Sequence, residues 1–548
     1  MTTVFTGGTV VVVADRDGSP ITTTALAWSD GRVVAHGAEA LALAGEPGAE
    51  TIDLAGGTLV PGLGDGHAHP VLGGLEAAGP RIREAEDLDG ILAIVAEWKR
   101  EHPDDAWIVG GSYDATFAPG GRFDPRWLGA VTGGTPTVLR SWDYHTVWVN
   151  SAALAAAGIT ADTPDPELGR IVRREDGGPL GTLQEAAAND FLANVMPPFT
   201  LEARVAAIEA ATREYAALGM TWVQDAWVDP GDVETYLAAA LEDRLHTRVN
   251  LAFRADPALW REQVGEFSAM RERIRALRAR GDGRSGAERL TAETVKFFVD
   301  GVVENHTAAL IDPYADRPDD RGLPNWSPEE LREAAAAFDA AGFQLHLHAI
   351  GDAANRSALD ALEAAAARNP ARSGEDRAHV IAHVAILAPG DAERFARLGV
   401  IANFEPYWAQ CDAVMRDLTI PHIGVEREGW QYLIGTVLRS GATISFGSDW
   451  PVTTKDWRPA LSTAITRHSH LEPDAEPWLP EERISAGAAL SAYTAGIARQ
   501  ALAPDRGTLA VGAAADAAWL SANPLDAAPA SIPEIEVLGT WLAGERTH

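Results

Sequence analysis

Short apolar segments alternate with helical stretches through most of the chain, and this alternation constrains the fold more than any other feature. The separating stretches, such as SPEELREAAAAFDAAG, are rich in Ala, Glu and Arg, which favour helices. Eight segments are typical of strands: the one that ends in HAH, and residues 221–226, 248–255, 294–301, 343–352, 378–384, 399–406 and 442–449. Eight is the number of strands that a closed parallel β/α barrel needs. We therefore predict an α/β protein whose main body is a distorted (β/α)8 TIM barrel.

Both ends of the chain differ from this middle because they are rich in short strands and turns. Residues 1–60 and 505–548 share that character, which predicts a small β-sandwich built from both termini. The first barrel strand is assigned to residues 61–75 and the remainder of the barrel to 198–504. The first and second barrel strands are much farther apart than a βα loop allows. Residues 76–197 are therefore predicted to be an inserted α+β domain that follows the first barrel strand.

Charge and composition exclude several classes of function. The chain of 548 residues has a formal net charge of −33, which argues against nucleic acid or an anionic membrane surface as a partner. Cys411 is the one cysteine, so neither an internal disulfide nor a zinc site made of cysteines is expected. No apolar run is long enough to span a membrane, and the first residues do not resemble a signal peptide. A soluble, cytoplasmic protein is the expectation, with a homodimer as one option for its assembly.

The stretch PGLGDGHAHP places His67 and His69 one residue apart at the end of an apolar run. Alternate side chains of a strand point to the same face, and two imidazoles on one face suit a divalent metal ion. Two solvated loop histidines are the alternative. Reactive residues of β/α barrels come from the C-terminal ends of the strands. Those ends carry a set of side chains that favours a metal centre: His67, His69, Lys296, His348, His383 and Asp449.

Lys296 does not fit such a set as an ammonium ion, because a cation is a poor neighbour for a metal. A desolvated lysine beside cations has a lowered pKa, and the free amine can react with carbon dioxide to give a carbamate that bridges two metals. The alternative is a salt bridge to Asp300, which lies on the same face of the strand. His346 shares the face of His348 but lies deeper, which favours a buried neighbour of the centre over a ligand.

Several motifs together resemble the amidohydrolase superfamily, in the branch that includes N-substituted formamide deformylases. They span nearly the whole chain and include LVPGLGDGHAHP, HTVWVNSAAL, DPELGRIVRREDGGPLGTLQEAA, VKFFVDGVVENHTAAL, LHLHAIGDAA, VIAHVAILAPGDAERFARLGV, ISFGSDWPV and YTAGIAR. The resemblance implies a β/α barrel with a terminal β-sandwich and one or two divalent metals, usually zinc. The chain departs from the family pattern before His383, where it reads RAHVIAH, and we interpret Arg377 and His379 as structural.

The resemblance also implies a role for each ligand. His67 and His69 with Asp449 would hold the buried metal, and His348 and His383 the more exposed one. Lys296, carboxylated, would bridge them. Such metals make hydroxide available near neutral pH, and Asp449 can take the proton of the nucleophile and pass it to the departing amine.

Residues of the insertion and the barrel rim are candidates for substrate contacts. His145 could donate a hydrogen bond to the substrate carbonyl or its oxyanion. Glu185 matches a family position but could equally be a surface acid at the start of a helix. Four aromatic residues lie just past predicted strand ends: Trp227, Tyr407, Trp408 and Trp450. Aromatic residues often only pack a core, but this gathering favours an apolar or aromatic substituent on the substrate.

The most specific hypothesis is hydrolysis of an N-substituted formamide to formate and an amine with an apolar substituent. The alternatives are a hydrolase of another amide, a cyclic amide or an ester, and a lyase or isomerase built on the same metal barrel. A metal-free binding protein with this fold is a third, against which the complete set of ligands argues.

Overall fold

The computed structural model describes residues 2–14, 19–142, 144–280, 285–372, 377–469, 472 and 475–548. Its largest sheet has eight strands, each parallel to its neighbours. In chain order they are β8 (Leu63–Ala68), β14 (Met220–Val228), β15 (Arg248–Arg254), β16 (Leu290–Phe298), β17 (Gln344–Ala349), β18 (Val380–His383), β19 (Ile401–Phe404) and β20 (Ile444–Phe446). This is the predicted barrel, so the sequence prediction of the fold is confirmed.

The barrel closes where its last strand meets its first. β20 and β8 form no regular ladder, but Ala68, the last residue of β8, pairs with Trp450 beyond the end of β20. The backbone carbonyl of His67 accepts hydrogen bonds from the amides of Ser448 (3.2 Å) and Asp449 (2.7 Å). The distortion of the barrel therefore lies at this seam, and it brings the segment after β20 against the end of β8.

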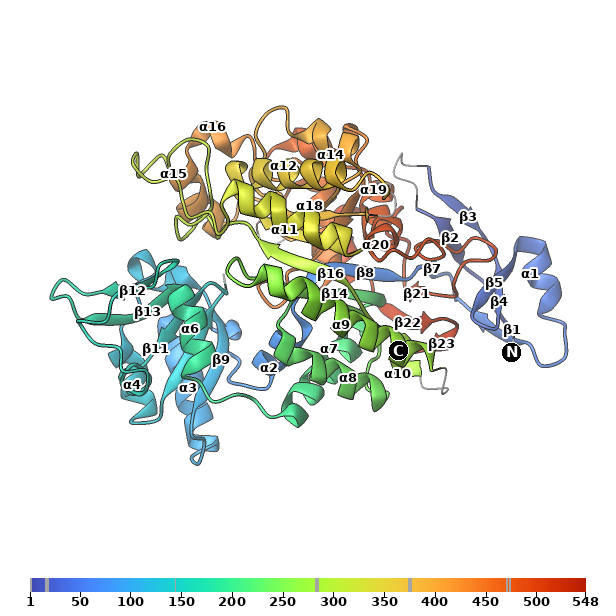
Figure 1. Ribbon diagram of the computed structural model, residues 1–548. Coiled ribbons are helices and arrows are strands. Elements are labelled where there is room, and N and C mark those ends of the chain that lie inside the picture. Colours follow the sequence, from blue (N-terminus) through green and yellow to red (C-terminus); the bar gives the residue numbers. More distant parts are fainter. Residues whose placement is uncertain are drawn as a thin grey trace.

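Helices follow the strands and cover the outside of the barrel (Figure 1). Their starts obey ordinary capping rules. Ser327, for example, accepts a hydrogen bond from the amide of Glu330, and Pro328 occupies the first helical position. The main helices are α7 (Leu201–Ala217), α8 (Val233–Leu241), α9 (Trp260–Ala279), α11 (Pro328–Ala340), α12 (Asp352–Arg368), α14 (Ala392–Leu398), α17 (Ile434–Arg439), α18 (Trp457–Thr466), α19 (Ala486–Tyr493) and α20 (Ala495–Gln500). Covered on its outer face, the barrel has strands that are buried throughout, as in β17.

Two smaller sheets lie at the ends of the chain: the first consists of N-terminal strands only, and the second combines N-terminal with C-terminal strands. One has the order β5-β4-β1-β6 and the other β23-β22-β21-β7-β2-β3. Phe5, Trp28 and Trp541 pack together between them. The strands are β1 (Thr2–Thr6), β2 (Thr9–Val13), β3 (Ile21–Thr23), β4 (Leu26–Ser29), β5 (Arg32–His36), β6 (Glu50–Asp53), β7 (Thr58–Pro61), β21 (Ala517–Leu520), β22 (Val537–Leu542) and β23 (Glu545–Arg546). The run TLVPGLGDGHAH is consequently two strands, because the chain leaves this sheet after β7 and enters the barrel as β8.

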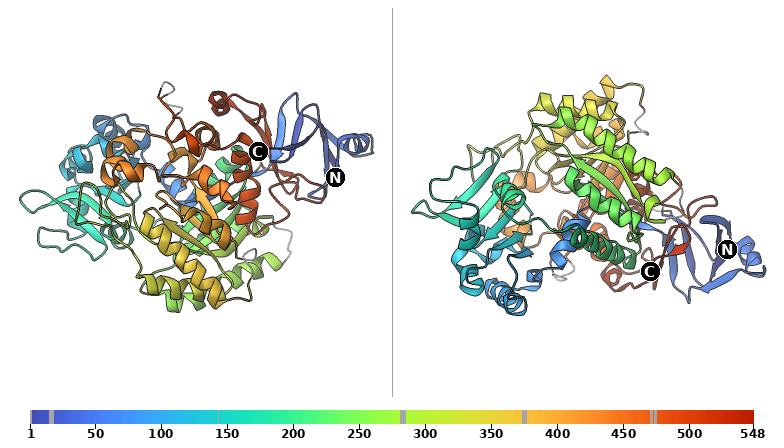
Figure 2. Two further views of the ribbon diagram at one scale, coloured as in Figure 1. Left: turned by 90° about the horizontal axis from the view of Figure 1, so that it is seen from above. Right: turned by 60° about the horizontal axis from the view of Figure 1, so that its bottom comes forward.

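A third body lies between β8 and β14 and has a five-stranded sheet in the order β12-β13-β11-β10-β9. Figures 1 and 2 show it on the opposite side of the barrel from the two termini. Its elements are α3 (Leu88–Glu101), β9 (Ile108–Tyr113), α4 (Pro125–Thr132), β10 (Thr137–Ser141), β11 (Thr146–Val149), α5 (Ser151–Ala156), β12 (Gly169–Arg173), β13 (Pro179–Glu185) and α6 (Ala186–Asn194). The preceding helix α2 (Pro70–Ala77) packs on α7 of the barrel, so closely that a Cβ at Gly74 would lie 2.3 Å from the Ala207 carbonyl oxygen. The predicted boundary at residue 76 thus falls within α2.

No helix in these described ranges is long and apolar enough to cross a membrane.

Candidate metal centre and active site

Side chains from both sides of the barrel seam form the first part of the site. His67 lies near the end of β8, His69 begins α2, and Asp449 follows β20. The Asp449 Oδ1 atom is 2.9 Å from Nε2 of His69 and 3.6 Å from Nε2 of His67. All three residues are buried. The backbone of Asp449 has a φ of 52°, a left-handed conformation that its hydrogen bond to His67 helps to hold.

Lys296 reaches the same point from β16. Its Nζ is 3.2 Å from Nε2 of His67, and the residue is fully buried. Burial lowers the pKa of Lys296 to about 7. Asp300, the alternative partner expected from the sequence, instead accepts hydrogen bonds from the amides of Ile350, Gly351 and Ala309. In the described part of the chain, the Lys296–Asp300 salt bridge is not formed.

His348 and His383 bring β17 and β18 to the cluster. The His383 ring lies 4.6 Å, between centroids, from both the His67 ring and the His348 ring. His348 Nε2 is 3.1 Å from the Gly301 carbonyl oxygen and 3.7 Å from Oδ1 of Asp300. The six side chains predicted from strand ends therefore meet at one end of the barrel.

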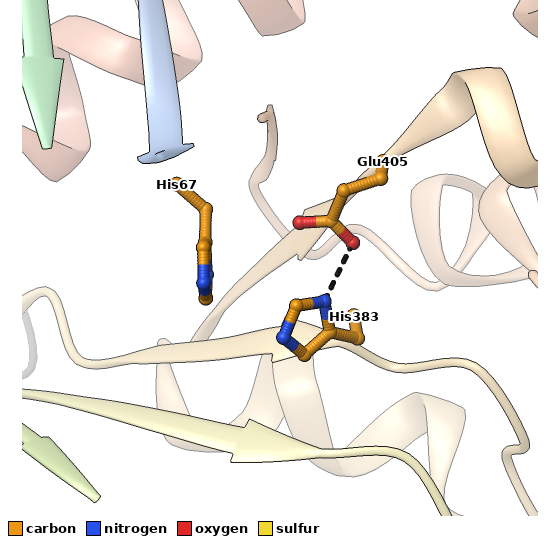
Figure 3. A group of neighbouring side chains, drawn as sticks. All are labelled: His67, His383 and Glu405. Carbon is orange, nitrogen blue, oxygen red and sulfur yellow. Dashed lines mark hydrogen bonds and ion pairs between the residues drawn. The ribbon is translucent and has the colours of Figure 1, made fainter. Parts of the chain in front are cut away.

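Glu405 belongs to this cluster although the sequence analysis assigned it no role. It follows β19, and its Oε2 lies 2.9 Å from Nδ1 of His383 (Figure 3). Its other oxygen is directed toward the side of His67 in that view. The signal that could have identified it is the rule applied to the other strands, because Glu405 follows the end of the seventh strand in NFEP.

Three further buried residues contact or lie close to His67 and His69. His346 Nε2 lies 2.9 Å from Nδ1 of His67, on the side away from Lys296. Asp65 accepts hydrogen bonds from the amides of His67 and Ser448, at 3.2 and 3.0 Å. Asp225 of β14, also missed from the sequence, has Oδ1 3.9 Å from Nδ1 of His69. The contact with His346 holds the ring of His67, and Asp65 holds the backbone on both sides of the barrel seam.

The donor set fits a divalent metal ion. Ligand atoms of His67, His69 and Asp449 lie within 4.8 Å of one another, as do those of His67, His383 and Glu405. Glu405 Oε1 and His69 Nδ1 are buried without a hydrogen-bond partner among the described residues. Burial lowers the pKa values of His67, His69 and His348, so their imidazoles are neutral and offer lone pairs. Imidazole and carboxylate are the ligands that zinc and related metals bind.

The inserted domain contributes a second histidine–carboxylate pair. His145 Nδ1 is 2.8 Å from Oε2 of Glu185, whose Oε1 accepts a hydrogen bond from Thr307 Oγ1 at 2.7 Å. The His145 ring lies 5.9 Å from that of His348. Burial opposes ionisation of Glu185, but the charge and hydrogen bond of His145 outweigh it and hold the pKa of Glu185 below its usual value. Glu185 is therefore a partner of His145 and not a surface acid.

The aromatic residues of the rim divide into two groups. Trp408 stacks on His383 with ring centroids 5.6 Å apart and planes at 11°, and Trp227 meets His69 edge-on at 6.3 Å. Phe298, which the sequence analysis missed, lies between Trp227 (4.9 Å) and His348 (5.2 Å). Trp450 packs elsewhere, against Gly73 and under the ammonium group of Lys455 at 3.7 Å. Tyr407 is partly buried beside Trp408 in the same short helical turn.

Comparisons with known proteins address the family of this chain. The model of the amidohydrolase family matches residues 50–548. Protein LONG AFTER FAR-RED 3 from Arabidopsis thaliana is 31% identical over 516 residues, covering 91% of this chain and 84% of that protein. N-substituted formamide deformylase from Arthrobacter pascens is 26% identical, covering 94% and 93%. The crystal structure of an uncharacterized metal-dependent hydrolase from Pyrococcus horikoshii OT3 has a TM-score of 0.74 at 23% identity, covering 96% of this chain and 99% of that one.

The chain therefore belongs to the amidohydrolase family. It is a metal-dependent hydrolytic enzyme that acts on carbon–nitrogen bonds.

Proposed function

We propose that this enzyme hydrolyses N-substituted formamides, giving formate and an amine whose substituent is apolar. The observation that carries the proposal is a group of three aromatic residues beside the predicted metal ligands, called the aromatic wall below. Trp408 packs on His383, Trp227 on His69, and Phe298 lies between Trp227 and His348. Such a wall favours a ring or alkyl group on the substrate. The deformylase from Arthrobacter pascens supplies the formamide part of the hypothesis.

His67, His69 and Asp449 would hold one zinc ion, and His348 and His383 would hold a second. Lys296 would bridge them as a carbamate: its neutral amine attacks carbon dioxide and releases one proton, which leaves an N-carboxylate. The lowered pKa of Lys296 provides the neutral amine for this step. When bound, the metal supplies Lewis-acid polarisation of the amide carbonyl and lowers the pKa of water. Another divalent metal could replace zinc in the same set of ligands.

Asp449 is the proposed proton carrier. Its carboxylate takes a proton from the attacking water and returns it to the amide nitrogen, because an amide nitrogen leaves readily only when protonated. His145 is the proposed donor to the carbonyl oxygen. The Glu185 carboxylate would favour the imidazolium form of His145, in which Nδ1 donates to Glu185 and Nε2 would donate to the developing oxyanion.

A panel of N-formyl and N-acyl amines, with detection of the released amine and formate, tests the proposal. N-benzylformamide should be hydrolysed about 10–100-fold more efficiently than N-methylformamide, since burying a ring contributes about 1.5–3 kcal/mol. Preference for charged amino-acid amides would contradict the proposed substrate. Turnover without consumption of water would indicate a lyase or an isomerase instead.

A further inference from the structure

A second cluster of histidines lies in two loops outside the barrel centre. His306 and Asp316 belong to the loop between β16 and α11, and His422 lies in the short helix α15 (Ile420–Ile423), between β19 and β20. His306 Nε2 is 2.9 Å, and His422 Nδ1 2.8 Å, from the same Oδ2 atom of Asp316. The two imidazole rings are 4.0 Å apart, between centroids. One carboxylate oxygen therefore faces two imidazole nitrogens.

Hydrogen bonds to backbone carbonyls join these two loops independently of the three side chains of the cluster. The amide of Ala315 donates to the carbonyl of His422 at 2.7 Å. The Arg427 guanidinium donates to the carbonyls of Asp312 and Pro313, at 2.8 and 2.7 Å. These contacts place the segments that carry Asp316 and His422 in advance, which lowers the entropic cost of binding an ion between them.

The spacing of the three ligand atoms suits one ion. All three lie within 4.8 Å of one another. Two atoms, each about 2.1 Å from a zinc ion, are about 3.0–3.4 Å apart for angles between octahedral and tetrahedral. The observed separations of 2.8 and 2.9 Å require the nitrogens to move from the carboxylate by only a few tenths of an ångström.

Burial and charge also suit an ion at this position. His306 is buried, and burial lowers its pKa, so its imidazole is neutral and can offer a lone pair. The side chains of Asp316 and His422 are 36% and 17% exposed, which leaves room for water to complete the coordination. The nearby cation Arg317 is paired with Asp320 at 3.5 Å, and this pairing reduces its repulsion of a metal. The overall charge of −33 further favours a cation.

We propose that His306, Asp316 and His422 form an additional site for a divalent transition-metal ion, best suited to Zn²⁺, that shares no ligand with the barrel centre. Bound there, the ion would join the loops that follow β16 and β19, the strands that lead to Lys296 and Glu405. Two imidazoles and one carboxylate are a common set for zinc, with water in the remaining position. The site is independent of the substrate proposed above.

Zinc titration of the purified holoenzyme tests this site, with bound metal counted by mass spectrometry after gel filtration. The wild-type protein should bind one more equivalent of zinc than His422→Ala or Asp316→Asn. Loss of an outer hydrogen-bond partner already costs about 10–100-fold in metal affinity, so loss of a ligand should cost at least that. His246→Ala is the matched control, because His246 is also a partly exposed histidine near a carboxylate, 3.9 Å from Glu209. It should bind as much zinc as the wild type.

Equal zinc content and affinity in all four proteins would overturn the proposal and leave a cluster held only by hydrogen bonds. Asp316→Asn keeps the shape of the side chain and decides the question if His422→Ala does not fold. Added zinc should also raise the thermal midpoint of the wild type and of His246→Ala, but not that of Asp316→Asn. Activity toward any amide is not a readout, so failure of this proposal is distinct from failure of the proposed function.

Discussion

The barrel centre and the inserted domain each hold a histidine against a glutamate, at nearly the same distance. His383 and Glu405 are 2.9 Å apart, and His145 and Glu185 are 2.8 Å apart. The pairs differ in burial, because the side chains of the first are 2% and 0% exposed and those of the second 16% and 15%. The histidine–glutamate pair is therefore fully buried in the barrel centre and partly exposed in the inserted domain.

This difference indicates different tasks. A buried carboxylate at the end of a strand, such as that of Glu405, can hold a metal-binding histidine in one orientation. A pair that stays partly exposed can contact a substrate and respond to a change of its charge. His383, Asp449 and Glu185 all have positive φ, at 72°, 52° and 52°. Both regions thus keep strained backbone, a cost of about 1–3 kcal/mol per residue that functional sites often carry.

The most severe test of the barrel centre is Asp449→Asn. Loss of the proton carrier should lower kcat by about 10²–10⁴-fold or more, while much of the metal stays bound. Steady-state kinetics and metal analysis of the same preparation measure both effects. Asp456→Asn is the control, since Asp456 caps α18 and asparagine also caps helices well. Activity of Asp449→Asn within a few-fold of the wild type would show that another residue carries the proton.

Lys296→Ala should lose bound metal and most activity, because the bridging carbamate cannot form. Short carboxylic acids added with bicarbonate should restore part of both. Lys455→Ala is a control with a second poorly exposed lysine, whose Nζ pairs with Glu214 at 2.6 Å. It should keep its metal. An experimental structure with Lys296 as a free amine would end the carbamate hypothesis.

Substitution of Glu405 in the barrel centre and of Glu185 in the inserted domain tests directly whether the two pairs have different roles. Glu405→Gln should weaken metal binding by about 10–100-fold, as outer partners of metal-bound histidines do. Glu185→Gln should leave metal content unchanged and lower kcat, by about tenfold, with little change in KM, because it weakens only the imidazolium form of His145. Metal titration and kinetics of the pair distinguish the roles. An equal loss of metal in both variants would remove the distinction between the two regions.

The aromatic wall should give the smallest effects. Trp408→Ala should reduce kcat/KM by about 10–100-fold for N-benzylformamide and much less for N-methylformamide. Trp450→Ala should affect both substrates alike, because Trp450 packs against α2 and Lys455. The ratio of kcat/KM values for the two substrates is the measurement. Equal losses across the series in Trp408→Ala would mean that Trp408 only packs the barrel.

Local patterns were sufficient to predict the barrel. The segment 221–226 corresponds to β14 (Met220–Val228), and 248–255 to β15 (Arg248–Arg254), because the apolar runs of buried strands are contiguous in the sequence. The break between β7 and β8 was not predictable in the same way. It depends on which distant strands pair with each half, since β7 joins β2 and β21 whereas β8 joins β14.

Strand ends also predicted most of the site. The rule that reactive residues lie at the C-terminal ends of barrel strands predicted Lys296 and His383. Applied to the seventh strand as well, it would have predicted Glu405. The partnership of His145 with Glu185 follows from the pairing of β11 with β13, which places the segments around these residues side by side. The Trp450 ring packs against Gly73 of α2, where a larger side chain would leave it no room. Such contacts between distant segments leave no periodic signal in the sequence.

A divalent metal ion is expected to bind where the six side chains from the strand ends meet. Anomalous diffraction from crystals of the purified protein, recorded at the absorption edge of the metal that copurifies, tests it most directly. A peak is expected about 2.0–2.2 Å from ligand atoms of His67, His69 and Asp449. A catalytically active protein with no anomalous peak at this position would contradict it.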